Sequence, residues 1–314
     1  MATHWSAVLP ASADCDRDAL RAALQQAVDE VDAQMSLWKP ESALMRLNRA
    51  EPGVWVDLPE RILAVLELGL AVGRASGGAF DIGLGDAVCA WGFGPGPADP
   101  ARIRAALSAP RRPAHDLVEL DLAGRRARKH APLTLDLNGI AKGHGVDRLA
   151  ETLRAAGIAQ ALVGIDGEMR ALGTRPGAAG WHVAIEAPDP ARRAALSMLV
   201  LADAAVATSG DYRHRLRARD PDGAALGRWV SHTIDPRRGV PLADPPASVT
   251  VLAPSCALAD AWATALMVLG PGAGAGHARA QGLDALFLLR KDGGGVRPLG
   301  IGPVFAPQWS SGAA

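Results

Sequence analysis

Hydrophobic residues recur along the chain with two spacings, one typical of helices and one typical of strands. A stripe of leucines and valines between Asp14 and Pro40 falls on one helical face and predicts a helix there. Similar spacing, with an N-cap such as Ser42 and a glycine stop such as Gly157, predicts the other helices. These helices cover residues 42–47, 59–77, 98–107, 146–157 and 256–269.

Short apolar runs without helical spacing predict strands, and many of these strands follow one another without an intervening helix. This order favours an α+β fold with mostly antiparallel sheets and packed helices, because parallel neighbours need long crossovers. The runs at 181–185, 199–206 and 229–234 are expected to extend the sheet, and 272–276 is expected to be a turn. The predicted strands cover residues 5–9, 117–122, 133–137, 161–165, 169–172, 181–185, 199–206, 229–234, 249–252 and 285–289.

The stretch 133–147 combines three signals. Three leucines alternate with polar residues up to Leu137, which predicts a strand, and glycines follow at positions 139, 143 and 145. Asp136 then lies near the strand end and Lys142 on a glycine-rich turn before the helix. Such a turn lets backbone N–H groups approach a phosphate, but a tight strand-to-helix connection explains it equally well. The stretch lacks both the Walker A and the GxGxxG patterns.

Composition adds several constraints. The 314 residues suffice for one large domain or two smaller ones, and the formal net charge is zero, so charge does not favour nucleic acid or an anionic membrane. The three cysteines lie far apart and form neither a zinc pattern nor a disulfide framework. We find no apolar stretch of about 18 residues and no signal peptide, so we expect no transmembrane segment.

The helix predicted at 256–269 carries only two strongly polar residues after its first turn, Asp260 and Thr264. They are four positions apart and therefore share one face. A carboxylate in such an apolar helix is costly unless it is paired or binds a metal, and two oxygen donors suit Mg²⁺. The alternative is local: Asp260 caps a nearby segment and Thr264 hydrogen-bonds back to its own helix.

His232 lies where an alternating run breaks at Asp235-Pro236, a position from which a general base can be presented. A lone histidine is more often structural, so the residue alone does not decide. The polar turn at 208–212 is a weaker signal of the same kind.

Taken together, these stretches resemble the ApbE-type FAD:protein FMN transferases, and the resemblance runs almost from end to end. Each motif is modest alone, but their order over about 300 residues makes chance agreement implausible. The matching segments are 1–5, 35–42, 78–81 with 91–94, 136–145, 208–212, 232–236 with Gly239, and 259–264.

The resemblance implies a single catalytic domain over 1–314, related to the T-fold, with two interleaved α/β subdomains and the active site between them. It implies that FAD is the substrate, that Mg²⁺ is the cofactor, and that FMN is moved onto a Thr of an acceptor flavoprotein while AMP is released. It places the metal on Asp260, Thr264 and the backbone carbonyl of Gly139. It offers His232 as a candidate base, with Asp136 or Asp81 as lesser candidates. It places flavin contacts on Met1, Trp38, Ala79, Phe80, Asp81, Asp136, Lys142 and Ile234.

Two features depart from the family pattern. Exported members begin with a lipoprotein signal ahead of the first motif, so we expect a cytoplasmic location as the sequence stands, and a periplasmic or membrane-anchored one if its start is trimmed. Members often carry Asn-x-Gly-Gly where this chain has Gly164-Ile-Asp-Gly167. Two alternatives remain: a Mg²⁺-dependent FAD pyrophosphatase, and a flavin carrier without turnover.

Overall fold

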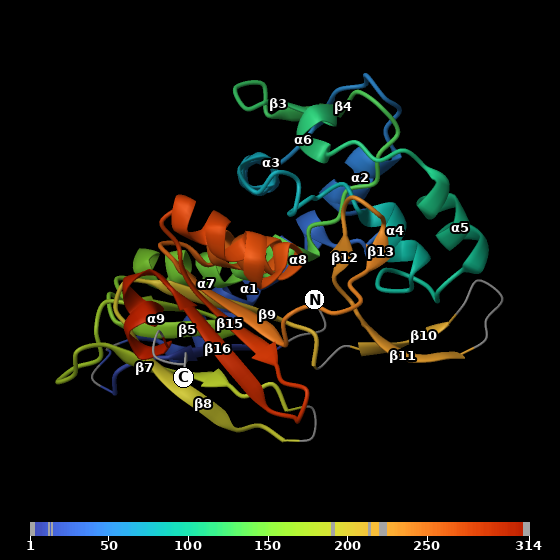
Figure 1. The fold of residues 1–314 in the computed structure, drawn as a ribbon. Helices are drawn as coiled ribbons and strands as arrows, with labels where there is room; N and C mark the ends of the chain where they lie inside the picture. Colours follow the sequence, from blue (N-terminus) through green and yellow to red (C-terminus); the bar gives the residue numbers. More distant parts are fainter. Residues whose placement is uncertain are drawn as a thin grey trace.

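A computed structural model describes residues 4–11, 13, 15–189, 192–212, 215–219 and 225–309. Figure 1 shows a large sheet with helices packed against it, and a group of smaller elements at one end of the molecule. The predicted α+β class is confirmed, because the strands pair antiparallel and the helices are packed around them. The predicted division into two interleaved subdomains stays a prediction.

The large sheet has seven strands in the order β1-β5-β6-β9-β14-β15-β16. Its inner strands β5, β14 and β15 carry runs of buried residues rather than an alternation, because the sheet is covered on both faces. Asp166, with a positive φ of 60°, and Gly167 form the two-residue turn between β5 and β6. The strands are β1 (Trp5–Val8), β5 (Ala161–Ile165), β6 (Glu168–Leu172), β9 (Ala205–Gly210), β14 (Ser248–Ala253), β15 (Asp284–Arg290) and β16 (Val296–Ile301).

The remaining strands form small separate sheets, which corrects the expectation that 181–185, 229–234 and the whole of 199–206 extend the large one; only 205–206 belong to it. The run 199–206 is broken by a turn in which Asp203 has a φ of 47°, so it supplies the end of β8 and the start of β9. These sheets pair β2 (Val56–Asp57) with β4 (Arg126–Lys129) and β3 (Val118–Asp121), β7 (Trp181–Glu186) with β8 (Ala195–Leu201), β10 (Arg215–Arg219) with β11 (Ala225–Ser231), and β12 (Ile234–Asp235) with β13 (Val240–Pro241).

Three long helices cover one face of the large sheet, and the β7–β8 pair covers the other (Figure 1). The three are α1 (Arg17–Met35), α7 (Asn138–Ala155) and α8 (Cys256–Ala280). On the other face, Trp181 and Leu199 pack against Leu288 and Phe305. Shorter helices complete the fold: α2 (Ala43–Arg49), α3 (Glu60–Ala75), α4 (Gly85–Ala90), α5 (Pro100–Ser108), α6 (Ala114–Leu117) and α9 (Gly302–Trp309).

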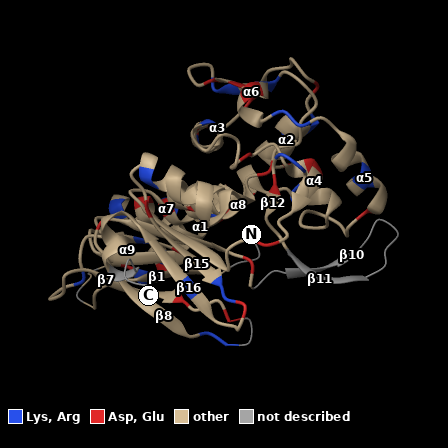
Figure 2. Cartoon of the chain, viewed as in Figure 1, with Lys and Arg blue, Asp and Glu red and all other residues tan. Residues whose placement is uncertain are grey.

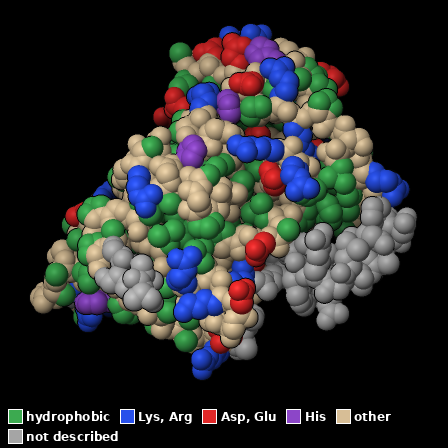
Figure 3. Space-filling view, in the orientation of Figure 1, with side chains coloured by type: hydrophobic (Ala, Val, Ile, Leu, Met, Phe, Trp, Pro, Cys, Tyr) green, Lys and Arg blue, Asp and Glu red, His purple; other side chains and the backbone are tan. Residues whose placement is uncertain are grey.

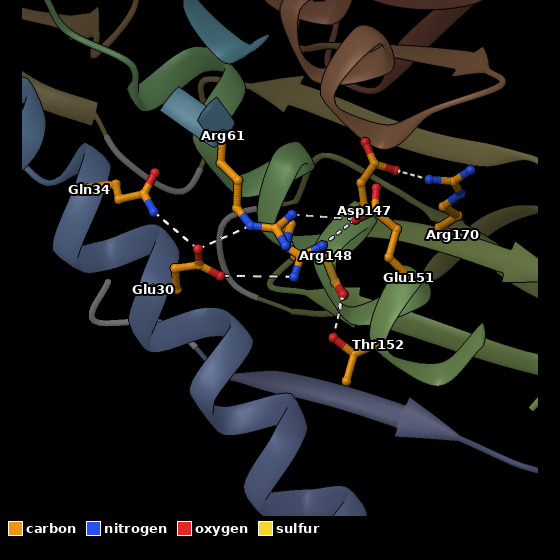
Figure 4. A network of polar contacts seen from close by, with 8 residues as sticks. All are labelled: Glu30, Gln34, Arg61, Asp147, Arg148, Glu151, Thr152 and Arg170. Atoms are coloured by element: carbon orange, nitrogen blue, oxygen red, sulfur yellow. Dashed lines mark hydrogen bonds and ion pairs between the residues drawn. The ribbon is translucent and has the colours of Figure 1, made fainter. Parts of the chain in front are cut away.

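Charged side chains lie mainly around this framework rather than within it. Apart from Asp260 and Arg279, α8 carries no charged residue, and Figure 2 draws it and much of the large sheet in the colour of uncharged residues. Basic and acidic side chains are interspersed over the face seen in Figure 3. Figure 4 shows one polar network, in which Glu30 of α1 accepts a hydrogen bond from Arg61 of α3 at 3.0 Å and lies 3.8 Å from Arg148 of α7. This network joins α1, α3 and α7.

The predicted strand at 133–137 is wrong, although the chain there is extended and its leucines alternate as expected. Its backbone bonds go to a loop and a side chain instead of a neighbouring strand. The Asp136 N–H donates to the carbonyl of Ile82 at 2.8 Å, and the Leu135 N–H donates to the side chain of Asn48 at 2.7 Å. The segment therefore lies between α2 and the loop at Ile82, and it leads directly into α7.

The glycine-rich turn is also wrong, because α7 begins at Asn138 and contains all three glycines and Lys142. Close packing against α8 explains the glycine at 143. A Cβ atom there would lie 2.3 Å from the carbonyl oxygen of Cys256 and 2.8 Å from the Cα atom of Ala257. Asp147, one turn later, accepts hydrogen bonds from the backbone N–H groups of Cys256 and Ala257 at 2.8 and 2.9 Å. The two helices are thus fixed to each other at the start of α8.

The predicted stop at Gly270-Pro271 takes the form of a kink. Gly270 has φ 70° and ψ 179°, and the chain resumes its helix at once, so the turn expected at 272–276 is wrong. Proline is tolerated here because it begins a new helical segment. Within the described residues, α8 is the one helix long and apolar enough to cross a membrane, with a mean hydropathy of 1.3. It packs against the large sheet, and a buried core helix can be as long and as apolar as one that spans a membrane.

We predict that Gly143→Ala destabilises the protein, because the added methyl group meets backbone atoms of α8 that cannot rotate away. The free energy of unfolding in urea should fall by about 1–3 kcal/mol, as in other overpacked cores. Gly276→Ala, in the second segment of α8 where a Cβ atom meets no neighbour within 4 Å, is the matched control and should be neutral or stabilising. Equal effects at the two positions would contradict the close contact.

Candidate active site

A cavity of about 1060 Å³ opens beside the start of α7 and the first half of α8. Its wall draws on segments far apart in the sequence: the end of α1, the turn after α3, the β5–β6 turn, β9, and residues 232–236. All but one of the predicted site residues lie on this wall, and Met1 lies outside the described residues. Those on the wall are Trp38, Ala79, Phe80, Asp81, Asp136, Gly139, Lys142, His232, Ile234, Asp260 and Thr264. The structure thus brings these residues together, while their chemical roles remain predictions.

Asp260 is a buried carboxylate on this wall, with only 4% of the residue exposed. Its Oδ2 atom accepts a hydrogen bond from the backbone N–H of Gly143 on α7 at 3.0 Å. Burial raises the pKa of Asp260 well above its ordinary value, the charge of Glu168 raises it further, and Lys142 opposes both. Asp260 therefore contacts a distant helix rather than capping a nearby segment of its own.

Thr264 lies one turn after Asp260 and also faces the cavity. Its hydroxyl is hydrogen-bonded to the hydroxyl of Ser209 on β9 at 3.2 Å, so it reaches across to the sheet. A Cβ atom at Gly139 would lie 3.3 Å from the Thr264 hydroxyl and 3.2 Å from the ring of Phe80. The start of α7, the polar face of α8 and an aromatic ring therefore meet at one point.

Lys142 pairs with Glu168, a residue that the sequence reading did not select. The Lys142 ammonium group lies 2.6 Å from Oε1 of Glu168, which is only 2% exposed. Burial alone lowers the pKa of Lys142, but the charges of Glu168 and Asp260 outweigh it and raise the pKa above its ordinary value. The sequence feature that could have identified Glu168 is its position as an acidic residue directly after Asp166-Gly167, at the start of an apolar strand.

Asp81 and Asp136 differ in what they already bind. Asp81 accepts hydrogen bonds from the N–H groups of Gly83 at 2.8 Å and Ala114 at 3.1 Å, so it holds two loops together. Asp136 accepts a hydrogen bond from the backbone N–H of Asn138 at 3.0 Å, at the start of the helix that follows it. Burial raises the pKa of Asp136 to about 6, partly offset by N–H donors from Asn138 and Leu137. Of these two carboxyl groups, Asp136 is the better placed to exchange a proton.

The remaining wall is largely apolar. Phe80 and Ile234 are each 4% exposed, and Trp38 lies at the rim with about half of its surface exposed. His232 contacts Phe93 edge to face, with ring centroids 6.4 Å apart. An apolar wall with a few convergent polar groups is typical of a site for a mid-sized organic ligand. The arrangement defines an α+β protein with one large site that combines an aromatic wall and a buried carboxylate.

Comparison with known proteins agrees with this description. The sequence matches the model of the ApbE family over residues 1–287. It is 33% identical over 302 residues to the FAD:protein FMN transferase of Klebsiella pneumoniae (strain 342), covering 95% of this chain and 84% of that protein. Among solved structures, it is similar to the flavin transferase ApbE from Vibrio cholerae, with a TM-score of 0.82, 30% identity and coverage of 98% and 96%. The apo flavinyl transferase ApbE of Pseudomonas stutzeri gives a TM-score of 0.80, 31% identity and coverage of 99% and 98%.

The chain therefore belongs to the ApbE family and, like these relatives, is an enzyme.

We predict that Asp136 makes the stability of the folded protein fall as the pH rises. Its pKa is about 6 in the folded protein and near the ordinary 3.8 in the unfolded chain. Between these values the folded chain binds more protons, so the free energy of unfolding decreases with increasing pH. Asp136→Asn removes this dependence. Its stability relative to wild type should improve by about 1–3 kcal/mol between about pH 4 and about pH 7.

Chemical denaturation across that pH range measures the effect. Asp244→Asn, at an exposed position outside the cavity, controls for the loss of one carboxylate. A difference between the Asp136→Asn variant and wild type that stays constant with pH would contradict the raised pKa.

Proposed function

We propose that this protein is a Mg²⁺-dependent FAD:protein FMN transferase that attaches FMN to a Thr of an acceptor flavoprotein and releases AMP. The observation that carries the proposal is the meeting of Asp260, Thr264 and Gly139 beside Phe80 on the wall of one large cavity. Polar groups for a pyrophosphate there adjoin an aromatic surface for a flavin ring. The names of the relatives support the same activity.

The residues present fit a magnesium ion. Mg²⁺ binds through one or two carboxylates and completes its shell with other oxygen atoms, and Asp260 and Thr264 supply a carboxylate and a hydroxyl. The described residues contain no group of three or more His, Cys, Asp or Glu side chains arranged for a metal, so a softer metal with nitrogen or sulfur ligands fits less well.

The backbone of α7 offers a third oxygen atom. In an α-helix the N–H of Gly143 points to the carbonyl of Gly139, four residues earlier. Here that N–H also donates to Asp260, which leaves the Gly139 carbonyl with capacity for a further partner. A bound Mg²⁺ would neutralise charge on the pyrophosphate during phosphoryl transfer.

The proposed reaction breaks the phosphoanhydride bond of FAD and forms a phosphate ester bond to the acceptor. The hydroxyl oxygen of the acceptor Thr forms a bond to the phosphorus of the FMN half, and the bond from that phosphorus to the AMP phosphate breaks. The Thr proton passes to His232, or to Asp136 in its place, and AMP leaves. Phe80, Ile234 and Trp38 hold the isoalloxazine ring by apolar contact, which fixes the phosphorus relative to the incoming hydroxyl.

A product assay separates this proposal from its two alternatives. The protein is incubated with FAD and Mg²⁺, with and without a candidate acceptor, and AMP and free FMN are measured. AMP that forms only with the acceptor supports the transferase. Free FMN without acceptor would identify a pyrophosphatase, in which water replaces the Thr hydroxyl. Bound FAD that remains intact in both reactions would identify a carrier.

We predict that Asp260→Asn lowers Mg²⁺-dependent turnover by about 10²-fold or more, because a metal ligand at the pyrophosphate contributes several kcal/mol to the transition state. Asn keeps an oxygen atom for the Gly143 N–H, so the packing of α7 on α8 is retained. Thr264→Val removes a neutral oxygen donor and should cost less. Asp244→Asn is the control and should leave turnover unchanged, whereas full activity of Asp260→Asn at ordinary Mg²⁺ removes the metal assignment.

For His232 we predict a loss of chemistry without a loss of binding. A general base acts in the transition state, so His232→Asn should leave FAD affinity close to wild type and lower turnover by about 10²–10⁴-fold. The defect should shrink at high pH, where the acceptor hydroxyl ionises more readily. His182→Asn, on the exposed side of β7, is the matched control.

Melting temperature, FAD affinity and turnover are measured on one preparation of each variant. A His232→Asn variant that loses stability and FAD binding together, with normal turnover per flavin-bound molecule, would show a structural role instead.

A further inference from the structure

Lys142 and Glu168 form an ion pair on the cavity wall, next to the proposed metal ligand Asp260. The distance between the Lys142 Nζ and Glu168 Oε1 atoms is 2.6 Å. Both residues line the cavity together with Asp260. The Lys142 ammonium group therefore lies on the same wall as two buried carboxylates, those of Glu168 and Asp260.

The fold fixes Glu168 more firmly than Lys142. Glu168 is the first residue of β6 and lies directly opposite Ile165 across the two-residue turn. Its second carboxylate oxygen accepts a hydrogen bond from the backbone N–H of Gly167 at 3.3 Å. Lys142 approaches it from α7 on a flexible four-carbon chain, with about a third of its side chain exposed. Glu168 thus acts as the stationary partner of the pair.

Lys142 can also compete for Asp260. It precedes Gly143, whose N–H group is bonded to the Asp260 carboxylate, so the base of the lysine side chain lies beside that carboxylate. The charges of Lys142 and Asp260 also interact. An ammonium group that turned from Glu168 to Asp260 would neutralise the carboxylate that a divalent cation needs.

We propose that Glu168 is a positioning residue that holds the Lys142 ammonium group away from Asp260 and so keeps this carboxylate open to a divalent cation. The inference rests on the proposed function, because it concerns the same metal site. It assigns Glu168 no contact with the metal or with FAD. Its effect passes through Lys142 alone.

The test measures Mn²⁺ binding to the flavin-free protein by electron paramagnetic resonance, so its readout does not depend on turnover. Glu168→Gln keeps the size of the side chain but removes the charge that retains Lys142. We expect the Mn²⁺ dissociation constant to rise about tenfold or more. Adding Lys142→Met should restore affinity to within about threefold of wild type. Lys142→Met alone should have a much smaller effect, so the two substitutions should be coupled by about threefold or more.

Three results would overturn the inference. Unchanged Mn²⁺ affinity in Glu168→Gln shows that Lys142 does not compete. Equal effects of Lys142→Met in both backgrounds show that Glu168 acts only through its own charge. A double variant that binds no better than Glu168→Gln shows that Glu168 is itself a ligand or a structural support. If Glu168→Gln does not fold, as judged by melting, Glu168→Asp withdraws the carboxylate from Lys142 by one methylene group and so weakens its hold. The same comparisons then apply, with smaller expected effects.

Failure of the proposed function looks different. A wild-type protein that binds Mn²⁺ with the expected coupling, yet forms no AMP with any acceptor, keeps the positioning role and loses the transferase assignment. A wild-type protein that binds no Mn²⁺ overturns both. A wild-type protein that transfers FMN while Glu168→Gln binds Mn²⁺ normally overturns only the role of Glu168.

Discussion

The close approach of α7 to α8 at Gly143 is the constraint on which the candidate site depends. The two backbones come so near that a Cβ atom at this position would overlap the carbonyl of Cys256. The same approach lets the Gly143 N–H reach the buried carboxylate of Asp260. It also places Gly139, one turn before Gly143 on α7, beside Thr264, one turn after Asp260 on α8. The packing of these two helices therefore sets the relative positions of the polar groups of the site.

The electrostatics of this contact work against stability and in favour of binding. Burial raises the pKa of Asp260, and the nearby charge of Glu168 raises it further, so the folded protein bears a cost for keeping Asp260 ionised. Lys142 offsets only part of that cost. A divalent cation from solution would offset the remainder, and this supports the proposed metal site. The apolar wall around Phe80 and Ile234 strengthens these interactions by excluding water.

Sequence alone predicted the features that depend on local spacing. Ser42 caps α2 as expected, Gly157 follows the end of α7 with a positive φ of 78°, and Asp260 and Thr264 share a face of α8. The errors fall where distant partners decide. Residues 133–137 are extended without being a strand because Asn48 and the loop at Ile82 take their backbone bonds. The glycines of α7 were read as a turn because nothing near them in the sequence reveals the approach of α8.

Glu168 was missed for the same reason, since its partner Lys142 lies 26 positions earlier on another element. Residues such as Trp38 and Ala79 carry no physical signal of their own in the sequence. Only the resemblance to the ApbE family selected them, and the structure then placed them on the same cavity wall. The resemblance to the family therefore predicted the site residues on the loops. The spacing of apolar residues predicted the helix that carries Asp260 and Thr264.

The central claim is that the FAD pyrophosphate lies beside a metal ion held by α7 and α8. Phosphorus-31 NMR of protein-bound FAD, with substoichiometric Mn²⁺ in place of Mg²⁺, tests it most directly. The account predicts strong paramagnetic broadening of both phosphorus resonances in the wild-type protein, and little broadening when Asp260 is replaced by Asn while FAD stays bound. Phosphorus resonances that broaden equally in both proteins, or not at all when FAD and Mn²⁺ are both bound, would contradict it.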